Sequence, residues 1–397
     1  MLVWFAMEQI RMIVLFITAA SSVQGIFLAL LLFSLKKGNP KANRLLAFFL
    51  LSFSISIGHV FVPYLFGLGM IQYRLGDPAQ LLFGPLFYFY VLYLTSPDTV
   101  FKKKYILHFL PFCINAICSG FLDNLNTYPV HSLLFWGIIL AQMWIYLFFS
   151  YQLIRKYDRK LRENFSSTEK INLDWLKTFI TFLFFIYFFY LFFLPVLAHV
   201  KVFYSHFYYG LRLILAVFLY ALGYKGMLQP RVFVLDHRTN GENREQAAGP
   251  DEKNPPNFPG GNEKSIPEKE KYSRSNLKES DILRELNKLT VLLEQEKLYL
   301  NPEFTLNDLS EKSGLSVHHL SEVINRGCGK NFYDFINSYR LEEFKRLLSD
   351  PVKRKQYTLL SLAYDAGFNS KATFNKIFKK TTGLTPSRYK EKSSNFE

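Results

Sequence analysis

The sequence predicts an all-α protein in three parts: a seven-helix transmembrane bundle, a flexible linker and a C-terminal module of short helices. Long apolar runs fill the chain up to residue 224, and most of the aromatic residues, 17% of the 397-residue chain, lie there. Short amphipathic segments with helix-capping residues fill the chain from residue 277 onward. We therefore assign residues 1–235 to the membrane part, 236–276 to the linker and 277–397 to the module.

Seven apolar runs succeed one another in the first part, and each is close to the roughly 20 residues that a helix needs to cross the hydrocarbon core. They cover residues 12–35, 45–67, 79–95, 105–122, 128–154, 178–198 and 202–224. Some contain Pro or Gly, which membrane helices tolerate because neighbouring groups satisfy the backbone. The runs therefore predict seven membrane spans.

Basic residues in the connections predict the orientation of these spans. The connections after the first, third and fifth runs hold four, three and seven Lys or Arg residues, whereas those after the second, fourth and sixth hold one, none and one. Cytoplasmic connections carry the excess of Lys and Arg. The alternation requires an odd number of spans, with the N-terminus outside and the C-terminus in the cytoplasm. We expect a multi-pass protein of the bacterial cytoplasmic (inner) membrane with its C-terminal module in the cytoplasm.

A cleaved signal peptide is the alternative interpretation of the first run, because residues 19–22 are small and resemble a cleavage site. Cleavage there would leave only about 11 apolar residues before Lys36, which is too short to cross a bilayer. We therefore retain the first run as a span.

Five polar residues within or at the ends of the predicted spans are candidates for sensing a signal. They are His59, His108, His131, His206 and Arg212. Ionisable groups inside a bilayer are costly and commonly mark ligand or proton pathways. A structural or interfacial role is the alternative, since a residue such as Arg212 near the outer end of a run can extend to the lipid headgroups. Both roles stay open at this stage.

The linker is defined by an abrupt change of composition. Asn, Glu, Lys, Pro and Gly dominate residues 236–276, and Pro255, Pro256 and Pro259 prevent a helix or strand of any length. Such a segment is expected to be a disordered tether. If flexible, it spans about 35 Å root-mean-square, which lets the module reach DNA near the membrane.

Periodic apolar residues predict the helices of the C-terminal module. Ser280 is expected to cap the first of them, and a long helix is expected over residues 331–348, capped by Asn331. The inward face of the first helix is expected to hold Leu283, Leu286, Leu289 and Leu293.

Capping and turn residues divide the module into two helix–turn–helix units. In the first unit, a capping pattern at Thr305 begins one helix, Gly314 forms the turn and Ser316 begins the next helix. In the second unit, Gly367 forms the turn and Ser370 begins the next helix. The long helix between the units has about 18 residues and is about 27 Å long. That length can place the second helix of each unit in successive major-groove turns of DNA, about 34 Å apart.

Residues 281–391 resemble the DNA-binding domain of the AraC/XylS family of bacterial regulators. The segments that carry the resemblance are LSEKSGLS at 309–316, NFYDFINSYR at 331–340, AYDAGFNS at 363–370 and FKK…GLTP at 378–386. The whole chain is similar to membrane-anchored members of that family, with seven spans ahead of the tandem units. Phe344 departs from the family pattern, which usually has a small residue there.

The resemblance implies that bases are read by outward residues of the second helix in each unit. These residues are His318, Ser321 and Glu322 in the first unit and Lys371, Ala372, Asn375 and Lys376 in the second. Lysines can reach guanine acceptors or phosphates, and Asn375 can pair with adenine. Glu322 can accept from a cytosine amino group, although a solvated surface charge is the alternative for it. Phosphates would be bound by Lys379, Lys380, Arg388 and Lys390.

The charge distribution favours the second unit as the main DNA anchor. Residues 345–392 hold twelve Lys or Arg and three Asp or Glu, a net charge of +9. A run of charge is usually a solvated face, but this one coincides with a recognition helix and indicates DNA binding.

We interpret the chain as a one-component membrane sensor that couples a membrane or extracytoplasmic signal to transcription. The expected partners are double-stranded DNA, the lipid bilayer and an unknown small-molecule or membrane signal, with RNA polymerase and a second copy of the chain (a homodimer) as further candidates. We find no nucleophile–base pair, phosphate-binding loop or zinc spacing, and expect neither an enzyme nor a cofactor or metal. The alternatives are a transporter-like membrane protein with a regulatory or tethering cytoplasmic domain, and a constitutive DNA anchor whose membrane half is inert.

Overall fold

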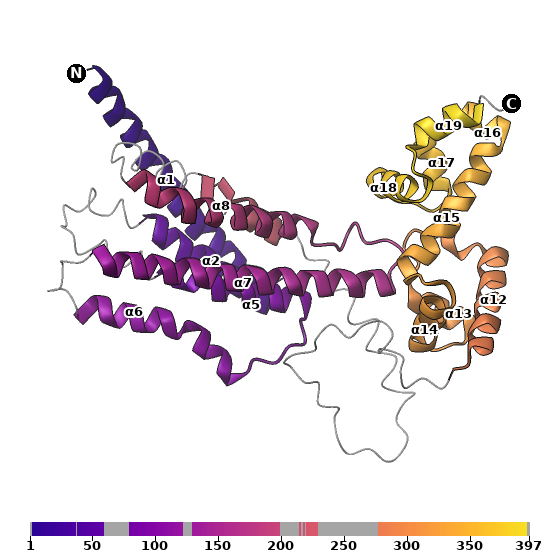
Figure 1. Ribbon diagram of the computed structural model, residues 1–397, viewed down its shortest axis with the longest axis horizontal. Coiled ribbons are helices and arrows are strands. Elements are labelled where there is room, and N and C mark those ends of the chain that lie inside the picture. Colours follow the sequence, from indigo (N-terminus) through magenta and orange to yellow (C-terminus); the bar gives the residue numbers. More distant parts are fainter. Residues whose placement is uncertain are drawn as a thin grey trace, which may run out of the picture. The chain divides into compact units, whose positions relative to one another are not determined.

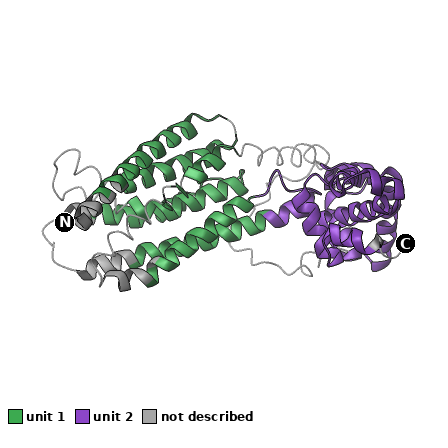
Figure 2. Ribbon diagram, turned by 90° about the horizontal axis from the view of Figure 1, so that it is seen from above, with its two compact units in different colours: residues 1–157, 173–235 green, residues 158–172, 236–397 purple. Residues whose placement is uncertain are grey.

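The computed structural model describes residues 2–36, 38–58, 79–121, 129–198, most of 214–228, and 277–394. The chain divides into two compact units, drawn in different colours in Figure 2. Unit 1 holds Met1–Tyr157 and Leu173–Leu235, and unit 2 holds Asp158–Asn172 and Asp236–Glu397. The sequence did not predict that a segment from the membrane part, residues 158–172, belongs with the C-terminal module. The predicted linker lies outside the described residues.

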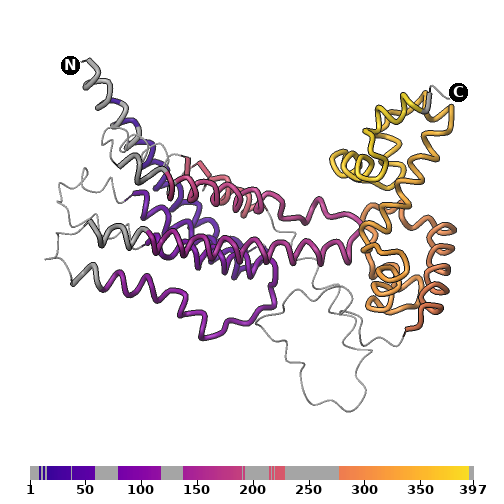
Figure 3. Tube along the Cα trace, in the orientation of Figure 1, coloured from indigo at the N-terminus to yellow at the C-terminus, as the bar shows by residue number. Residues whose placement is uncertain are grey.

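The secondary-structure elements of unit 1 within its described residues are all helices (Figures 1 and 3). Its elements are α1 (Leu2–Ser34), α2 (Pro40–Gly58), η2 (Gln80–Leu82), α5 (Phe83–Thr95), η3 (Lys103–Phe109), α6 (Leu110–Phe121), α7 (Pro129–Asn164) and α8 (Asp174–Ala198). The first six apolar runs fall on these elements where they are described, and most of the seventh lies outside the described residues. Two described stretches, Phe16–Ser34 and Gly137–Asn164, are long and apolar enough to cross a bilayer, and Gln80–Thr95 is a shorter apolar helix. The count of seven spans therefore stays a prediction.

Polar contacts and aromatic rings join the helices of unit 1. The Ser22 hydroxyl on α1 donates to the Ser54 carbonyl on α2 at 2.7 Å, and the Asn39 amide before α2 donates to the Tyr93 carbonyl on α5 at 2.8 Å. Between α2 and α5, the Phe53 ring stacks on the Phe83 ring with centroids 5.0 Å apart. These contacts satisfy buried polar groups without exposing them to solvent, which an apolar environment requires.

Unit 2 consists of helices and one short bridge within its described residues. Its elements are α12 (Glu279–Glu296), η5 (Leu298–Leu300), α13 (Leu306–Ser313), α14 (Val317–Cys328), α15 (Phe332–Ser349), α16 (Pro351–Gln356), α17 (Leu359–Asp365), α18 (Lys371–Thr382) and α19 (Pro386–Ser394). Figure 1 shows α12–α14 gathered around one end of α15 and α17–α19 around the other. The long helix predicted over 331–348 is therefore confirmed as the connection between two helical groups.

The inward face of α12 differs from the prediction by one position. Leu283 is 52% exposed, whereas its neighbour Ile282 is 1% exposed, and the N-cap residue is Lys278 rather than Ser280. Ile282 lies seven residues before Leu289, two helical turns away on the same face, so it completes the apolar stripe. The inward positions Leu289 and Leu293 are confirmed.

Two separate hydrophobic cores, both of which include residues of α15, stabilise unit 2. The N-terminal half of α15 contributes Phe332, Phe335 and Ile336 to the first core, and its C-terminal half contributes Phe344 and other residues to the second. The Phe344 ring lies 4.6 Å from Phe374 on α18, centroid to centroid. Because both cores include residues of α15, each helix–turn–helix unit packs against this same helix.

Candidate nucleic-acid interface

Side-chain caps fix the start of both helices in the first helix–turn–helix unit. Thr305 accepts a hydrogen bond from the Asp308 amide, and the Asp308 carboxylate accepts one from the Thr305 amide, so the predicted capping box is confirmed. Gly314 ends α13 with a φ of 70°, a left-handed conformation that favours glycine. Ser316 then caps α14 by accepting from the His319 amide. The turn and caps together hold α14 as the second helix of the unit.

The second helix–turn–helix unit follows the same plan with a longer connection, residues 366–370 between α17 and α18 against residues 314–316 between α13 and α14. Thr358 caps α17 and Ser370 caps α18, the latter by accepting from the Thr373 amide. Gly367 lies in the turn with a φ of 91°. A Cβ atom at this position would lie 2.5 Å from the Tyr299 carbonyl oxygen of η5. The predicted turn residue is therefore confirmed. The lack of a side chain at Gly367 also allows the second helix–turn–helix unit to approach the backbone before α13 closely.

The outward face of α18 carries the residues predicted to read bases in the second unit. Phe374 and Phe378 bury the inner face. Exposed on the other side are Lys371, Ala372, Asn375, Lys376, Lys379 and Lys380. Lysine ammonium groups and an asparagine amide on one exposed helix face offer donors to both phosphates and base edges.

The other predicted phosphate-binding residues lie in different surroundings. Arg388 on α19 is exposed. Lys390 is partly buried, and its ammonium donates to the Arg354 carbonyl of α16 at 3.2 Å while the Arg354 guanidinium donates to the Lys390 carbonyl at 3.1 Å. These reciprocal bonds tie α19 to α16, so Lys390 supports the fold of the basic surface. Lys380 lies 3.8 Å from the Asp334 carboxylate and remains 71% exposed.

The first unit presents a less basic surface on α14. His318 is exposed and Ser321 is half-buried, its hydroxyl accepting from the Asn325 amide at 3.3 Å. Glu322 differs from the prediction, because its side chain is only 2% exposed and its carboxylate lies 2.7 Å from the Arg326 guanidinium. A carboxylate held inside the fold by a neighbour one helical turn away is not placed to contact a base. The prediction that Glu322 faces outward to read a base is therefore wrong, and so is the alternative that it is a solvated surface charge.

Replacing Glu322 by alanine should therefore act on stability and leave base preference unchanged. Loss of its charge-assisted hydrogen bond to Arg326 should lower the free energy of unfolding by about 1–3 kcal/mol. Denaturant melts and binding to randomised DNA would measure the two effects separately. A changed base preference at unchanged stability would restore Glu322 as a reader.

A buried arginine network lies between the two helix–turn–helix units of unit 2, near the middle of α15, and sequence patterns did not single it out. Arg340 on α15 is 1% exposed, and its guanidinium donates to the Tyr299 carbonyl at 2.7 Å and the Asn301 carbonyl at 2.8 Å. It also donates to the Ser166 carbonyl and hydroxyl, each at 2.9 Å. Burial lowers the pKa of Arg340 to about 10, and the Glu169 carboxylate opposes part of that shift. Arg340 belongs to a family segment, but Ser166 lies 174 positions earlier, so no local signal could pair them.

The sensing candidates are only partly described. His108 in η3 lies in an aromatic cluster, with its Nδ1 atom 2.6 Å from the Tyr146 hydroxyl on α7 and the rings of Tyr88 and Phe89 beside it. His131 lies in α7, but its side chain is outside the described set, as are residues His59, His206 and Arg212 entirely. The structure thus brings none of the five predicted sensing residues together within its described part.

The two described cysteines lie in different surroundings, because Cys113 is exposed and Cys328 is partly buried. Burial raises the pKa of the Cys328 thiol, which keeps it in the unreactive thiol form. Among the side chains that the structure describes, no group of three or more His, Cys, Asp or Glu residues is placed to hold a metal ion.

Two helix–turn–helix units on one linking helix, each with a capped second helix, define the class of tandem helix–turn–helix modules. A family profile described as a helix-turn-helix domain matches residues 309–392. The chain is 30% identical over 95 residues to the probable transcription factor PqrA of Proteus vulgaris, a match that covers 24% of this chain and 75% of PqrA. The chain belongs to the AraC-type family of helix–turn–helix transcriptional regulators, which are not enzymes.

Longer relatives match a segment of similar length. The chain is 33% identical over 94 residues to an uncharacterized HTH-type transcriptional regulator of Staphylococcus aureus strain COL, covering 24% of this chain and 12% of the relative. A second such regulator of Staphylococcus aureus is 33% identical over 97 residues, with the same coverage of 24% and 12%. The chain thus matches about an eighth of the length of these relatives. No solved structure matches the chain significantly.

Proposed function

We propose that this protein is a membrane-bound, sequence-specific DNA-binding regulator of transcription. The observation that carries the proposal is the exposed face of α18, where Lys371, Asn375 and Lys376 lie on a capped second helix. Residues near the N-terminus of such a helix contact base edges in the major groove. Family membership supports the same role.

Exposed apolar side chains support a membrane location for unit 1. On α1, Phe16 is 71% exposed, and on α8, Phe185 is 63% exposed. Similar large apolar residues are exposed along α7, including Ile138, Ile145 and Phe148. Apolar surfaces of this extent on separate helices are typical of contact with lipid or a partner. Together with the seven apolar runs and the alternation of basic connections, they favour a seven-span bundle.

The composition of unit 2 supports the proposed orientation. Residues 158–172 lie in the most basic connection of the membrane part and pack with the C-terminal module in one compact unit. Two segments that pack together must lie on the same side of a bilayer. The positive-inside rule independently assigns both to the cytoplasm, where the DNA is. A signal received in unit 1 would therefore reach the module through covalent connections on the cytoplasmic side.

Single substitutions on α18 should separate base reading from phosphate binding. Lys371→Ala or Asn375→Ala should lose about 1–3 kcal/mol of discrimination at one base position. Lys380→Ala should weaken all sequences alike and reduce the slope of log affinity against log salt concentration by about 1. Binding of the full chain in lipid nanodiscs to a randomised DNA library, followed by titrations of selected sites at several salt concentrations, measures both quantities. Uniform loss from all three substitutions would contradict the assigned roles.

A further inference from the structure

Residues 158–172, which we name the strap, comprise the C-terminal end of α7 and most of its connection to α8, and they belong with the DNA-binding module in unit 2 (Figure 2). The strap is anchored at Ser166, which is 1% exposed. The Ser166 hydroxyl donates to the Phe304 carbonyl at 2.6 Å, and the Ser166 carbonyl accepts from Arg340 at 2.9 Å and from the Asn337 amide at 3.1 Å. The neighbouring Phe165 forms an antiparallel bridge with Thr305. Several buried hydrogen bonds of good length make this a specific docking contact.

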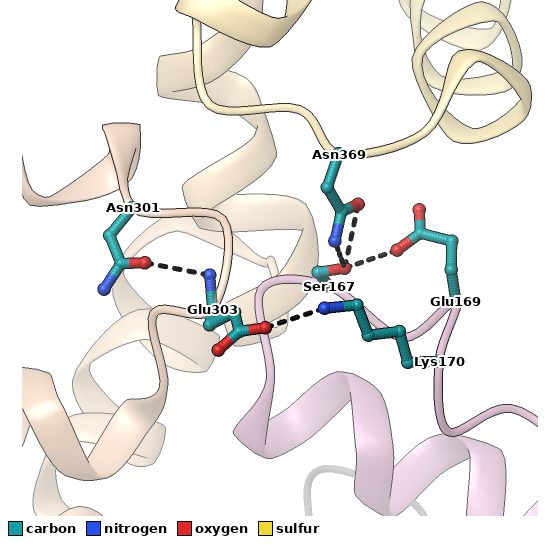
Figure 4. Close-up of polar contacts among 6 residues, drawn as sticks. All are labelled: Ser167, Glu169, Lys170, Asn301, Glu303 and Asn369. Carbon is teal, nitrogen blue, oxygen red and sulfur yellow. Dashed lines mark hydrogen bonds and ion pairs between the residues drawn. The ribbon is translucent and has the colours of Figure 1, made fainter.

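The strap reaches from this anchor to the start of the recognition helix of the second unit. The Ser167 hydroxyl lies 2.9 Å from the Asn369 amide nitrogen and 3.1 Å from its oxygen. Asn369 immediately precedes Ser370, the N-cap of α18, and stands two residues before Lys371. Figure 4 shows Ser167 bonded to both Asn369 and Glu169, so the strap also carries a carboxylate to this place.

The strap lies at the N-terminal ends of two further helices. Phe165 pairs with Thr305, the N-cap of α13, and the Arg162 guanidinium lies 5.2 Å from the ring centroid of Tyr333 in the first turn of α15. Burial, with a smaller contribution from the nearby Glu169, raises the pKa of Tyr333 to about 12, and Arg162 opposes part of that shift. The strap therefore occupies a surface that the starts of α13, α15 and α18 share.

Bound DNA is expected to contact the same surface. A recognition helix enters the major groove with its N-terminal residues against base edges, while the first helix of the unit crosses the phosphate backbone. Helix N-termini favour phosphate because their free amides and dipoles attract anions. A duplex on α18 would bring phosphates toward Glu169 on the strap, whereas the neighbouring Lys170 is paired with Glu303 at 2.8 Å (Figure 4). Like charges in the same place oppose each other.

We propose that the docked strap and operator DNA compete for this surface, so that unit 1 controls DNA binding by holding or releasing the strap through α7 and α8. The inference rests on the proposed DNA-binding function. It identifies the regulatory contact as Ser166 and Ser167 against Arg340, Phe304 and Asn369. A strap that instead braced the two units for DNA would act in the opposite direction, and the experiment below distinguishes the two.

A reversible cross-link tests the competition in a single preparation. In a full-length chain without its three native cysteines, Ser167→Cys and Asn369→Cys are joined by a short bis-methanethiosulfonate reagent, which a reducing agent releases. In nanodiscs, the cross-linked protein should bind its selected DNA site about tenfold more weakly than the same sample after reduction. Each single-cysteine variant treated with the reagent controls for modification alone. Equal affinities before and after reduction, tighter binding when cross-linked, or failure of the cross-link to form would each overturn the inference.

Release of the strap should have the opposite effect. Ser166→Phe places a bulky ring where a 1% exposed serine sits, and it should undock the strap and tighten DNA binding by about three- to tenfold. Ser166→Ala retains the backbone carbonyl that Arg340 and Asn337 contact, and it should have a smaller effect in the same direction. Weaker binding by Ser166→Phe would contradict competition. If the reduced cysteine protein binds no DNA site preferentially, the proposed function fails; if it binds but shows no dependence on the strap, only this inference fails.

Discussion

Replacing Gly367 by alanine should destabilise the second helix–turn–helix unit by about 2–6 kcal/mol, because strain and overlap add. The φ of 91° is a conformation that residues with a side chain rarely adopt. In addition, the new methyl group would lie 2.5 Å from the Tyr299 carbonyl oxygen and 2.9 Å from the Leu300 Cα atom, so backbone must move. Hydrogen exchange of the full chain in nanodiscs should therefore show faster exchange in α17 and α18, with α12–α14 less affected.

Gly383→Ala provides the matched control. Gly383 has a φ of 73° at the end of α18, but no atom lies within 4 Å of its ideal Cβ position. Only backbone strain applies there, about 1–2 kcal/mol. If Gly367→Ala destabilised the protein no more than Gly383→Ala, the close approach of the second helix–turn–helix unit to η5 would be contradicted.

Replacing Arg340 by methionine should cost about 3–5 kcal/mol, because it leaves several buried acceptors without a donor. The carbonyls of Tyr299, Asn301 and Ser166 all accept from this guanidinium. They belong to the segment before α13 and to the strap, so both should lose protection from hydrogen exchange together. Chemical denaturation followed by exchange of peptides from these segments measures the effect.

Arg340→Lys is the informative comparison for this site. A lysine keeps the positive charge but lacks the planar set of N–H donors with which one guanidinium donates to carbonyls on different sides. It should therefore recover only part of the lost stability. Full recovery would mean that the positive charge, and not the shape of the hydrogen-bond network, holds the strap to the first helix–turn–helix unit.

Local chemistry made much of the DNA-binding module predictable from sequence. The capping box at Thr305, the caps at Ser316 and Ser370 and the turn at Gly367 each depend on residues within a few positions, and all are confirmed. Leu283 was assigned inward because leucines spaced by three or four residues suggest a stripe, but the stripe is completed by Ile282. A one-residue error of this kind arises when two adjacent residues are both apolar.

The other differences arise from interactions that local patterns do not carry. Glu322 is buried because Arg326, one turn away, neutralises it, and charge alone gave no sign of which face it occupies. The strap contacts join positions that are 133 to 202 residues apart, such as Lys170 with Glu303 and Ser167 with Asn369. A composition shift marks a linker, but nothing in the composition of residues 158–172 marks a docking segment. Side-chain exposure on α18, in contrast, followed from its helical period.

Hydroxyl-radical footprinting of the full chain in nanodiscs on a selected DNA site tests the central claim most directly. We expect protection of the sugar–phosphate backbone beside two successive major grooves on one face of the duplex, about one helical turn or 34 Å apart, because α14 and α18 are held at opposite ends of α15. Protection that does not depend on DNA sequence even at low salt, or no protection of either segment, would contradict the account.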